Sequence, residues 1–326
     1  MKILMTPTPA QLERLGRPGQ DLPRWFAAPL VAATGGKASF CRSLPALLAS
    51  GRSGKGPDPA LVFNVGPLEA VLALYPLRTN LCSLYQWHPL EQLGPAKRFI
   101  YKRLLAKSKI VLAYSKITRR ELEQRFPGVP VRWIGLFTDT DFFDPGKTRA
   151  TPEPFMLCPG DHKRLEPVVS LLARELRMRV VRFSSGPEPA KYHARNPNPF
   201  VECLSGIPFS QVRNLYGSAR LILNAVDDRF WPVGITTFCE ALAMDKLVVT
   251  SGGHSCSGYE FGDGSRPYFT VHNCFDQEEW LRTTKLALGE AEPWAVGKSP
   301  RDLALHLCSF EATVAGWKSV LGIFNG

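Results

Sequence analysis

Two short segments in the second half of the chain contain residues suited to binding an anion. Lys163 and Arg164 follow a predicted strand at 155–158, so two cations stand just past a strand end. Residues 234–237 lead into a predicted helix at 237–243, and the first backbone N–H groups of a helix have no partner inside it. These N–H groups and the helix dipole attract phosphate. The two segments could therefore bind a phosphorylated ligand.

Each segment also has a simpler interpretation. Lys163 and Arg164 could be a solvated basic pair in front of a helix, and Thr236 or Thr237 could cap the helix that follows. The residues that lead into that helix are Gly234, Ile235, Thr236 and Thr237. A metal site is not expected, because no second pair of ligands accompanies His254 and Cys256.

Strands and helices alternate in both halves, which is typical of parallel, doubly wound sheets. In the first half, strands are predicted at residues 2–5, 60–65, 81–86, 110–115 and 131–134, and helices at 67–74, 95–107 and 118–126. In the second half, strands are predicted at 155–158, 179–183, 220–225 and 247–250, and helices at 166–176, 209–218, 237–243 and 277–288. Residues 186–199 are predicted to form a loop, and residues 144–154 are predicted to be the linker between the domains. We predict an α/β fold of two Rossmann-like domains that face a central cleft.

The charge of the chain is concentrated in its first half. The 326 residues carry a net charge of +11; residues 1–150 contain 22 Lys and Arg against 10 Asp and Glu, and residues 151–326 contain 18 against 19. This asymmetry indicates a polyanionic partner, either nucleic acid or an anionic membrane surface.

Several protein classes are not expected. No apolar run approaches the roughly 18–20 residues of a membrane helix, and the first residues are broken too soon by proline for a signal peptide. The eight cysteines are scattered, with no CxxC pair. Reduced thiols in a cytoplasmic protein are therefore the expectation.

Three stretches carry a resemblance to a known family. The first contains VLAYSK at 111–116, TRREL at 118–122 and TDTDFFDP at 138–145. The second is LCPGDHKRL at 157–165, and the third contains LYGSAR at 215–220, GITTFCEALAM at 234–244 and LVVT at 247–250. Over roughly residues 80–255, the chain resembles the retaining glycosyltransferases of family four, which have the GT-B fold.

The resemblance implies an activity and a division of the chain. A nucleotide-diphosphate sugar, expected to be a UDP-sugar, would bind to the C-terminal domain, and the N-terminal domain would hold the acceptor. Sugar transfer with retention, by attack on the side of the leaving group, would need neither a metal nor a cofactor. The implied domains are residues 1–148 and 149–305, with a helix in 306–326 that packs back on the first domain.

The resemblance also implies roles for single residues. Lys163 or Arg164, with residues 234–237, would stabilise negative charge on the leaving phosphate. Glu240 would accept hydrogen bonds from the donor ribose. His88, at a predicted strand end, would lie near the anomeric carbon of the sugar.

The chain departs from the family pattern at one acidic position. Eight residues before the glutamate, where the family has an acid, this chain has Pro232. Either Asp227 or Asp228 could be shifted into that role, or the role is absent. If it is absent, the alternative is a non-catalytic GT-B relative that binds nucleic acid or another polyanion.

A basic segment lies on the predicted acceptor side. Residues 95–132 contain eleven Lys and Arg against two Glu. The expected acceptor surface consists of Lys97, Arg98, Lys102, Arg103, Lys107, Arg119 and Arg120. It could attract an anionic membrane, at about 1 kcal/mol per basic residue, with a lipid or glycan acceptor. The resemblance favours a lipid or glycan acceptor, and the alternative is DNA, in which a hydroxylated base is flipped out and modified. Tyr85, Trp87 and Trp133 could stack on either acceptor. The expected location is cytoplasmic, and peripheral on the membrane in the first case.

Overall fold

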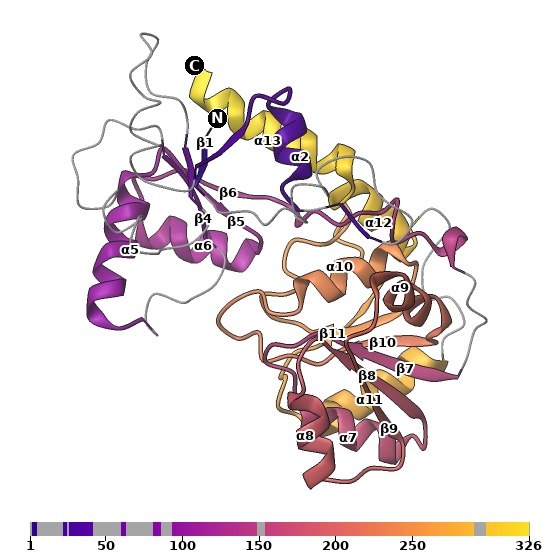
Figure 1. Cartoon of the computed structure of the whole chain (residues 1–326). Coiled ribbons are helices and arrows are strands. Elements are labelled where there is room, and N and C mark those ends of the chain that lie inside the picture. The colour runs from indigo at the N-terminus through magenta and orange to yellow at the C-terminus, as the bar shows by residue number, and fades with distance from the viewer. Residues whose placement is uncertain are drawn as a thin grey trace.

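The structure contains two parallel β-sheets, one in each half of the chain (Figure 1). This computed structural model describes residues 2–4, 22–24, 26–41, 60–62, 81–85, 93–148, 154–289 and 298–325. The strand order is β2-β1-β3-β4-β5-β6 in the first sheet and β12-β11-β10-β7-β8-β9 in the second. All neighbouring strands in both sheets pair in parallel.

The first half contributes short strands and two long helices. Its strands are β1 (Lys2–Leu4), β2 (Ser39–Cys41), β3 (Ala60–Val62), β4 (Leu81–Tyr85), β5 (Ile110–Ala113) and β6 (Val131–Trp133). Its helices are α2 (Ala28–Ala33), α5 (Pro95–Lys107), α6 (Lys116–Arg125) and the 3-10 turn η3 (Pro145–Lys147). The predicted helix at 67–74 lies outside the described residues.

The second half repeats the alternation. Its strands are β7 (Phe155–Pro159), β8 (Arg179–Ser184), β9 (Val201–Ser205), β10 (Leu221–Asn224), β11 (Val248–Ser251) and β12 (Phe269–Val271). Its helices are α7 (Glu166–Glu175), α8 (Glu188–Arg195), α9 (Phe209–Ser218), α10 (Ile235–Ala243), α11 (Gln277–Gly289), α12 (Pro300–Leu307) and α13 (Phe310–Asn325). The expectation that 186–199 is a loop was wrong, because α8 forms there. The helix expected at 237–243 begins earlier, directly after Gly234.

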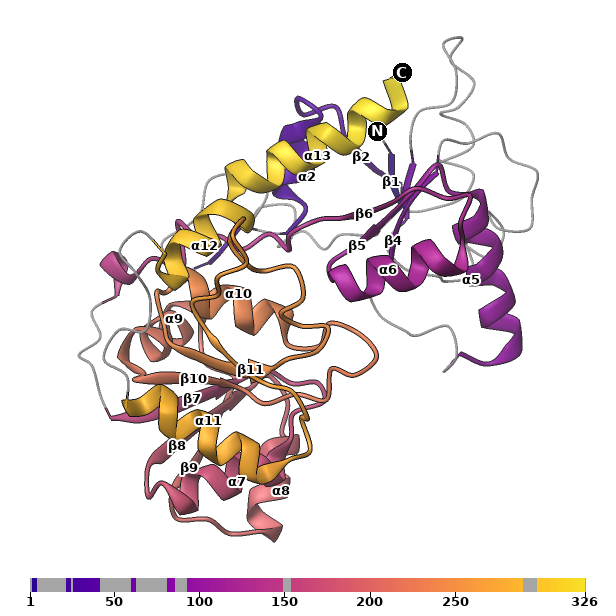
Figure 2. The ribbon, with the colours of Figure 1, turned by 180° about the vertical axis from the view of Figure 1, so that it is seen from behind.

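The strands of the second sheet are buried on both faces, as parallel strands covered by helices must be. On β7, Phe155 and Leu157 join one apolar cluster with α9 and α10, whereas Met156 and Cys158 join another with α7 and α11. Successive side chains of a strand point to opposite faces, which explains this division. Figure 2 shows α7 and α11 on the face of the sheet that is turned away from the first half.

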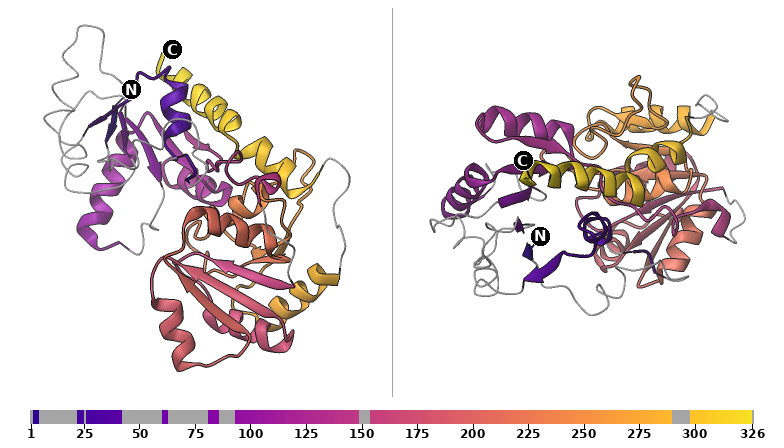
Figure 3. Two further views of the ribbon diagram at one scale, coloured as in Figure 1. Left: turned by 45° about the vertical axis from the view of Figure 1, so that its right-hand side comes forward. Right: turned by 90° about the horizontal axis from the view of Figure 1, so that it is seen from above.

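The chain passes between the halves twice. Residues 134–148 lead from β6 towards β7, with Phe142 and Phe143 buried along the way. On the return, α12 packs against α10, and α13 packs against α2 in the first half (Figure 3). The Thr138 N–H donates to the Cys308 carbonyl at 2.9 Å, so the two connections are joined to each other. None of the helices in the described ranges has the length and apolarity that a bilayer crossing requires.

Candidate functional site

The Arg164 side chain lies against the start of α10. Its Nη1 donates to Asn224 Oδ1 and its Nη2 to Thr237 Oγ1, both at 2.8 Å. The hydrophobic run of β10 ends at Asn224, and Thr237 is in the first turn of α10. Both acceptors are neutral, so neither bond neutralises the charge of the guanidinium.

Two glycines provide the space for this guanidinium. Gly160 has φ +104° and Gly234 has φ +78°, which are backbone conformations that other residues rarely adopt. A Cβ atom would lie 2.0 Å from Arg164 Nη2 at Gly160 and 2.6 Å from Arg164 Nη1 at Gly234. Gly234 is also the residue before α10, and no side chain of the described residues caps this helix. A cation and an uncapped helix N-terminus thus lie side by side, which is an arrangement suited to a phosphate group.

Lys163 lies further out than Arg164. Its backbone is left-handed, with φ +52°, and its carbonyl accepts a hydrogen bond from Asp227 N at 2.9 Å. The exposed ammonium lies 5.7 Å from the centre of the Trp231 ring, within the range of a cation–π contact. Of the two cations that the sequence indicates, Arg164 therefore lies against the start of α10, whereas Lys163 is exposed near Trp231.

The carboxyl group of Glu240 is half-buried on α10. Its Oε2 accepts a hydrogen bond from the buried Tyr216 hydroxyl at 2.9 Å. Burial raises the pKa of Glu240 to about 7, although the Tyr216 hydrogen bond and the charge of Arg164 oppose this effect. At neutral pH this carboxyl group therefore exchanges between its acidic and ionised forms.

Glu240 and Thr236 line a pocket between the two halves of the chain. The pocket has a volume of about 300 Å³. Its other walls include Phe26, Tyr114, Phe137, Phe209, Pro232 and Ile235. Apolar walls with a few polar groups are typical of small-molecule sites.

Asp227 and Asp228 both have partners close by. Asp227 pairs with Arg229, with Oδ1 2.8 Å from Nε, and this hydrogen bond lowers the pKa of Asp227. Asp228 is buried, and its Oδ2 accepts hydrogen bonds from Ser255 N at 2.9 Å and from Ser255 Oγ at 2.5 Å. Burial raises the pKa of Asp228. Pro232, at the position where the resemblance led us to seek an acid, forms part of the pocket wall.

His254 connects the second half of the chain to α6 in the first half. Its Nδ1 lies 2.9 Å from Thr118 Oγ1. Burial lowers the pKa of His254 to about 4, so the ring is neutral at pH 7. Next to it, Lys116 Nζ donates to Glu260 Oε1 at 2.8 Å. In the described part of the chain, no group of three or more His, Cys, Asp or Glu residues could hold a metal ion.

The basic residues of α5 and α6 are mostly at the surface. Five residues of the expected acceptor surface are exposed, namely Lys97, Lys102, Arg103, Lys107 and Arg120, and Arg125 at the end of α6 is exposed as well. Arg98 and Arg119 are half-buried, with Arg98 Nη2 bonded to the Leu93 carbonyl and Arg119 paired with Glu123. Phe99 lies among the exposed cations with 52% of its surface accessible. His88 and Trp87 lie outside the described residues, as does the Tyr85 side chain, while Trp133 is engaged with Tyr259 at the junction of the halves.

Two groups of the site went unrecognised in the sequence. Asn224 and Tyr216 hold Arg164 and Glu240, respectively. The signal for Asn224 is a single amide at the end of an apolar strand. Tyr216 has no such signal, because its partner lies on another helix.

The comparisons with known proteins concern the fold. No protein-family model and no curated protein matches the sequence. HepE from Anabaena, solved with UDP and glucose, is 14% identical, with 98% of both chains covered and a TM-score of 0.66. Sucrose-phosphate synthase from Thermosynechococcus elongatus is 12% identical, with 86% of this chain and 77% of that chain covered and a TM-score of 0.68.

A third solved structure belongs to AviGT4, a glycosyltransferase involved in avilamycin A biosynthesis. It is 16% identical, with 99% of this chain and 96% of that chain covered and a TM-score of 0.57. Likeness at such identities concerns the fold alone. The chain has the GT-B fold of two Rossmann-like domains, and this confirms the predicted fold class.

Proposed function

We propose that this protein is a glycosyltransferase that takes a sugar from a UDP-sugar. The observation that carries the proposal is the position of Arg164 beside the N-terminus of α10, with Glu240 further along the same helix. In this assignment, Arg164 and the first N–H groups of α10 bind the diphosphate, and Glu240 accepts hydrogen bonds from the ribose. HepE, which has the same fold, was solved with UDP and with UDP-glucose, which supports a UDP-sugar donor.

The proposed reaction proceeds with retention and without a metal. The bond between the anomeric carbon and the phosphate oxygen breaks, and the acceptor oxygen attacks the same carbon from the same side. The acceptor proton passes to the leaving phosphate, so atoms and charges balance. The charge that builds up on the diphosphate is stabilised by Arg164 and the α10 N-terminus. His88 would lie beside the anomeric carbon, and Asp227 or Asp228 would stand in for the missing acid.

We assign the donor to a C-terminal domain of residues 149–305 and the acceptor to an N-terminal domain of residues 1–148. The helix in 306–326 would complete the N-terminal domain, in keeping with the contact between α13 and α2. We also propose a cytoplasmic location. The six cysteines whose side chains the structure describes are free thiols, as a reducing compartment favours.

The acceptor that we propose is bound at an anionic membrane surface. The exposed cations of α5 would attract acidic lipids, and Phe99, exposed among them, would enter the headgroup layer. Arg103 stacks on the Phe99 ring at 5.4 Å, which keeps the aromatic and the cation on one face of the helix. Duplex DNA would use the same cations without needing the exposed aromatic ring.

The donor assignment is tested by calorimetric titration of UDP and uridine. Arg164→Met should weaken UDP binding at least about tenfold, the equivalent of one charge-assisted hydrogen bond, and should leave uridine binding unchanged. The control is Arg220→Met, because Arg220 is exposed at the opposite end of β10. Equal UDP affinity in both variants would refute the phosphate role of Arg164. UDP binding without turnover of any UDP-sugar would favour the non-catalytic alternative.

The acceptor assignment is tested by sedimentation with vesicles and by titration with DNA. We expect binding to phosphatidylglycerol-rich vesicles that weakens in salt and in Phe99→Ala. The matched control is Phe275→Ala, because Phe275 is an exposed phenylalanine in the other half of the chain, with 49% of its surface accessible. Binding to duplex DNA with a steep salt dependence, and none to vesicles, would select DNA instead.

A further inference from the structure

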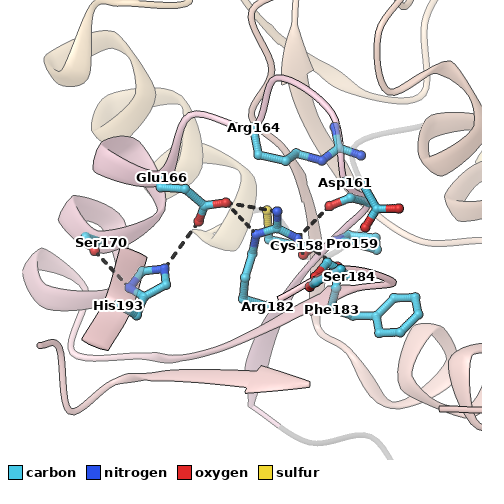
Figure 4. Close-up of polar contacts among 12 residues, drawn as sticks. Cys158, Pro159, Asp161, Arg164, Glu166, Ser170, Arg182, Phe183, Ser184 and His193 are labelled. Atoms are coloured by element: carbon cyan, nitrogen blue, oxygen red, sulfur yellow. Dashed lines mark hydrogen bonds and ion pairs between the residues drawn. The ribbon is translucent and has the colours of Figure 1, made fainter. Parts of the chain in front are cut away.

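Arg182 is a buried cation next to the proposed donor site. It lies on β8, and only 1% of its side chain is exposed. Its Nη1 donates to three backbone carbonyls, those of Gly160 and Phe183 at 2.7 Å and that of Cys158 at 3.1 Å (Figure 4). These carbonyls stand where β7 and β8 end and where the loop that carries Arg164 begins.

The charge of Arg182 is balanced from α7. Both Nε and Nη2 of Arg182 lie 2.9 Å from Glu166 Oε1. The other oxygen of Glu166 is 3.2 Å from His193 Nε2, and Ser170 Oγ is 3.5 Å from Nδ1 of the same ring (Figure 4). The pKa of Glu166 is lowered: burial alone would raise it, but the hydrogen bonds from His193 and Arg182 outweigh that effect. Because a buried charge without its partner is strongly destabilising, Glu166 is required to hold Arg182 inside the protein.

The backbone that Arg182 binds at Gly160 lies directly against Arg164. Gly160 contacts the Arg164 guanidinium so closely that a Cβ atom would be 2.0 Å from Nη2. Between Cys158 and Gly160, the Pro159 carbonyl lies 3.4 Å from Thr237 Oγ1, which is the atom that Arg164 binds. Movement of Gly160 would therefore displace Arg164 from α10.

We propose that Arg182 is a positioning residue for donor binding, which fixes the backbone at Gly160 so that Arg164 faces the N-terminus of α10. Glu166 is the anchor of Arg182 in this role. The inference rests on the proposed function, because the donor diphosphate is what Arg164 would bind. Arg182 itself touches neither donor nor acceptor in this assignment; it acts through the loop.

The test compares Arg182→Lys with Arg179→Lys. Both residues are on β8, and both pair with a glutamate, but Arg179 is exposed and bonds Glu202 at 2.7 Å. Lysine keeps the charge and loses the planar fork of donors that Arg182 uses. We expect amide hydrogen exchange in residues 158–165 to be about tenfold faster in Arg182→Lys, and UDP to bind about tenfold more weakly, as the loss of one charge-assisted hydrogen bond would produce. Uridine binding and the Arg179→Lys variant should match the wild type.

A second variant keeps the outcomes distinct. If Arg182→Lys does not fold, Glu166→Gln, which keeps an acceptor for Arg182, should show the same changes to a smaller degree. A folded Arg182→Lys with wild-type exchange in the loop, or with lower stability but unchanged UDP affinity, would overturn the inference. If the wild-type protein does not bind UDP, the proposed function fails, and the exchange measurement alone decides whether Arg182 holds the loop.

Discussion

Glu240→Gln should make the protein more stable at pH 8 and at the same time a poorer binder of UDP. The carboxyl group has an ordinary pKa of 4.5 in the unfolded chain and a pKa of about 7 in the folded protein, because of burial. Below pH 4.5 the group is neutral in both states and costs nothing. As the pH rises towards 7, ionisation is favoured only in the unfolded chain, so folding loses up to about 3 kcal/mol. Glutamine has the same shape, can still accept the Tyr216 hydrogen bond, and does not ionise.

The stability of the wild type and the variant is compared by urea denaturation between pH 4.5 and 8.5. The difference should be close to zero at pH 4.5, grow to about 3 kcal/mol near pH 7 and stay constant above it. Glu202→Gln is the control, because this carboxylate is exposed on β9. A difference that does not change with pH would refute the reasoning, since it would mean that the carboxyl group ionises as it does in water.

The same variant tests the ribose role in calorimetry. Loss of hydrogen bonds to a charged acceptor costs about 1.5–3 kcal/mol, so UDP affinity should fall roughly 10- to 100-fold at pH 8. In the wild type, UDP affinity should rise between pH 6 and 8, as Glu240 ionises. Unchanged UDP affinity in Glu240→Gln would refute the proposed hydrogen bonds between the ribose and Glu240, whatever the stability measurement shows.

Three further outcomes can be checked with the same methods. Gly234→Ala should cost about 1–3 kcal/mol of stability in urea, because φ is +78° and the new Cβ would lie 2.6 Å from Arg164 Nη1; wild-type stability would contradict this geometry. His254→Gln should reduce the decrease in the free energy of unfolding that occurs as the pH falls. The wild type should lose up to about 3 kcal/mol as the pH falls from 6.5 to 4, since the unfolded chain takes up the proton first, whereas glutamine can bond Thr118 at any pH; parallel curves would refute it. Lys163→Ala should weaken UDP binding less than Arg164→Met in the same titration, and the reverse order would exchange the roles of the two cations.

The alternation of apolar runs was sufficient to predict the sheets. Strands such as β5 and β10 are buried at every position, and such runs between turn residues are typical of parallel sheets. The helix at α8 was missed because Pro and Asn around it indicate a loop. In the structure, Pro187 is the residue before the helix and Pro189 is its second residue, where the missing N–H costs nothing.

The candidate site was predictable only where its residues follow the end of a strand. Gly234 and Arg164 each follow a strand, and strand ends in parallel sheets meet at one edge, so their proximity could be expected. The hydrogen-bond partners of Arg182 come from α7 and from the turn after β7. No local sequence pattern predicts a network between such separate segments. The sequence signal for this network is one cation, Arg182, between apolar residues of a strand.

The contact between α13 and α2 affects the order in which the protein can be completed as it is synthesised. The residues of α2 are synthesised long before those of their partner helix α13, which lies more than 270 residues further along the chain. Until then, Leu30, which is buried in the finished protein, lacks the neighbours that α13 supplies. Contacts between residues so far apart along a chain form late and slow the final step of folding. The first half therefore completes its packing only after the second half has been synthesised.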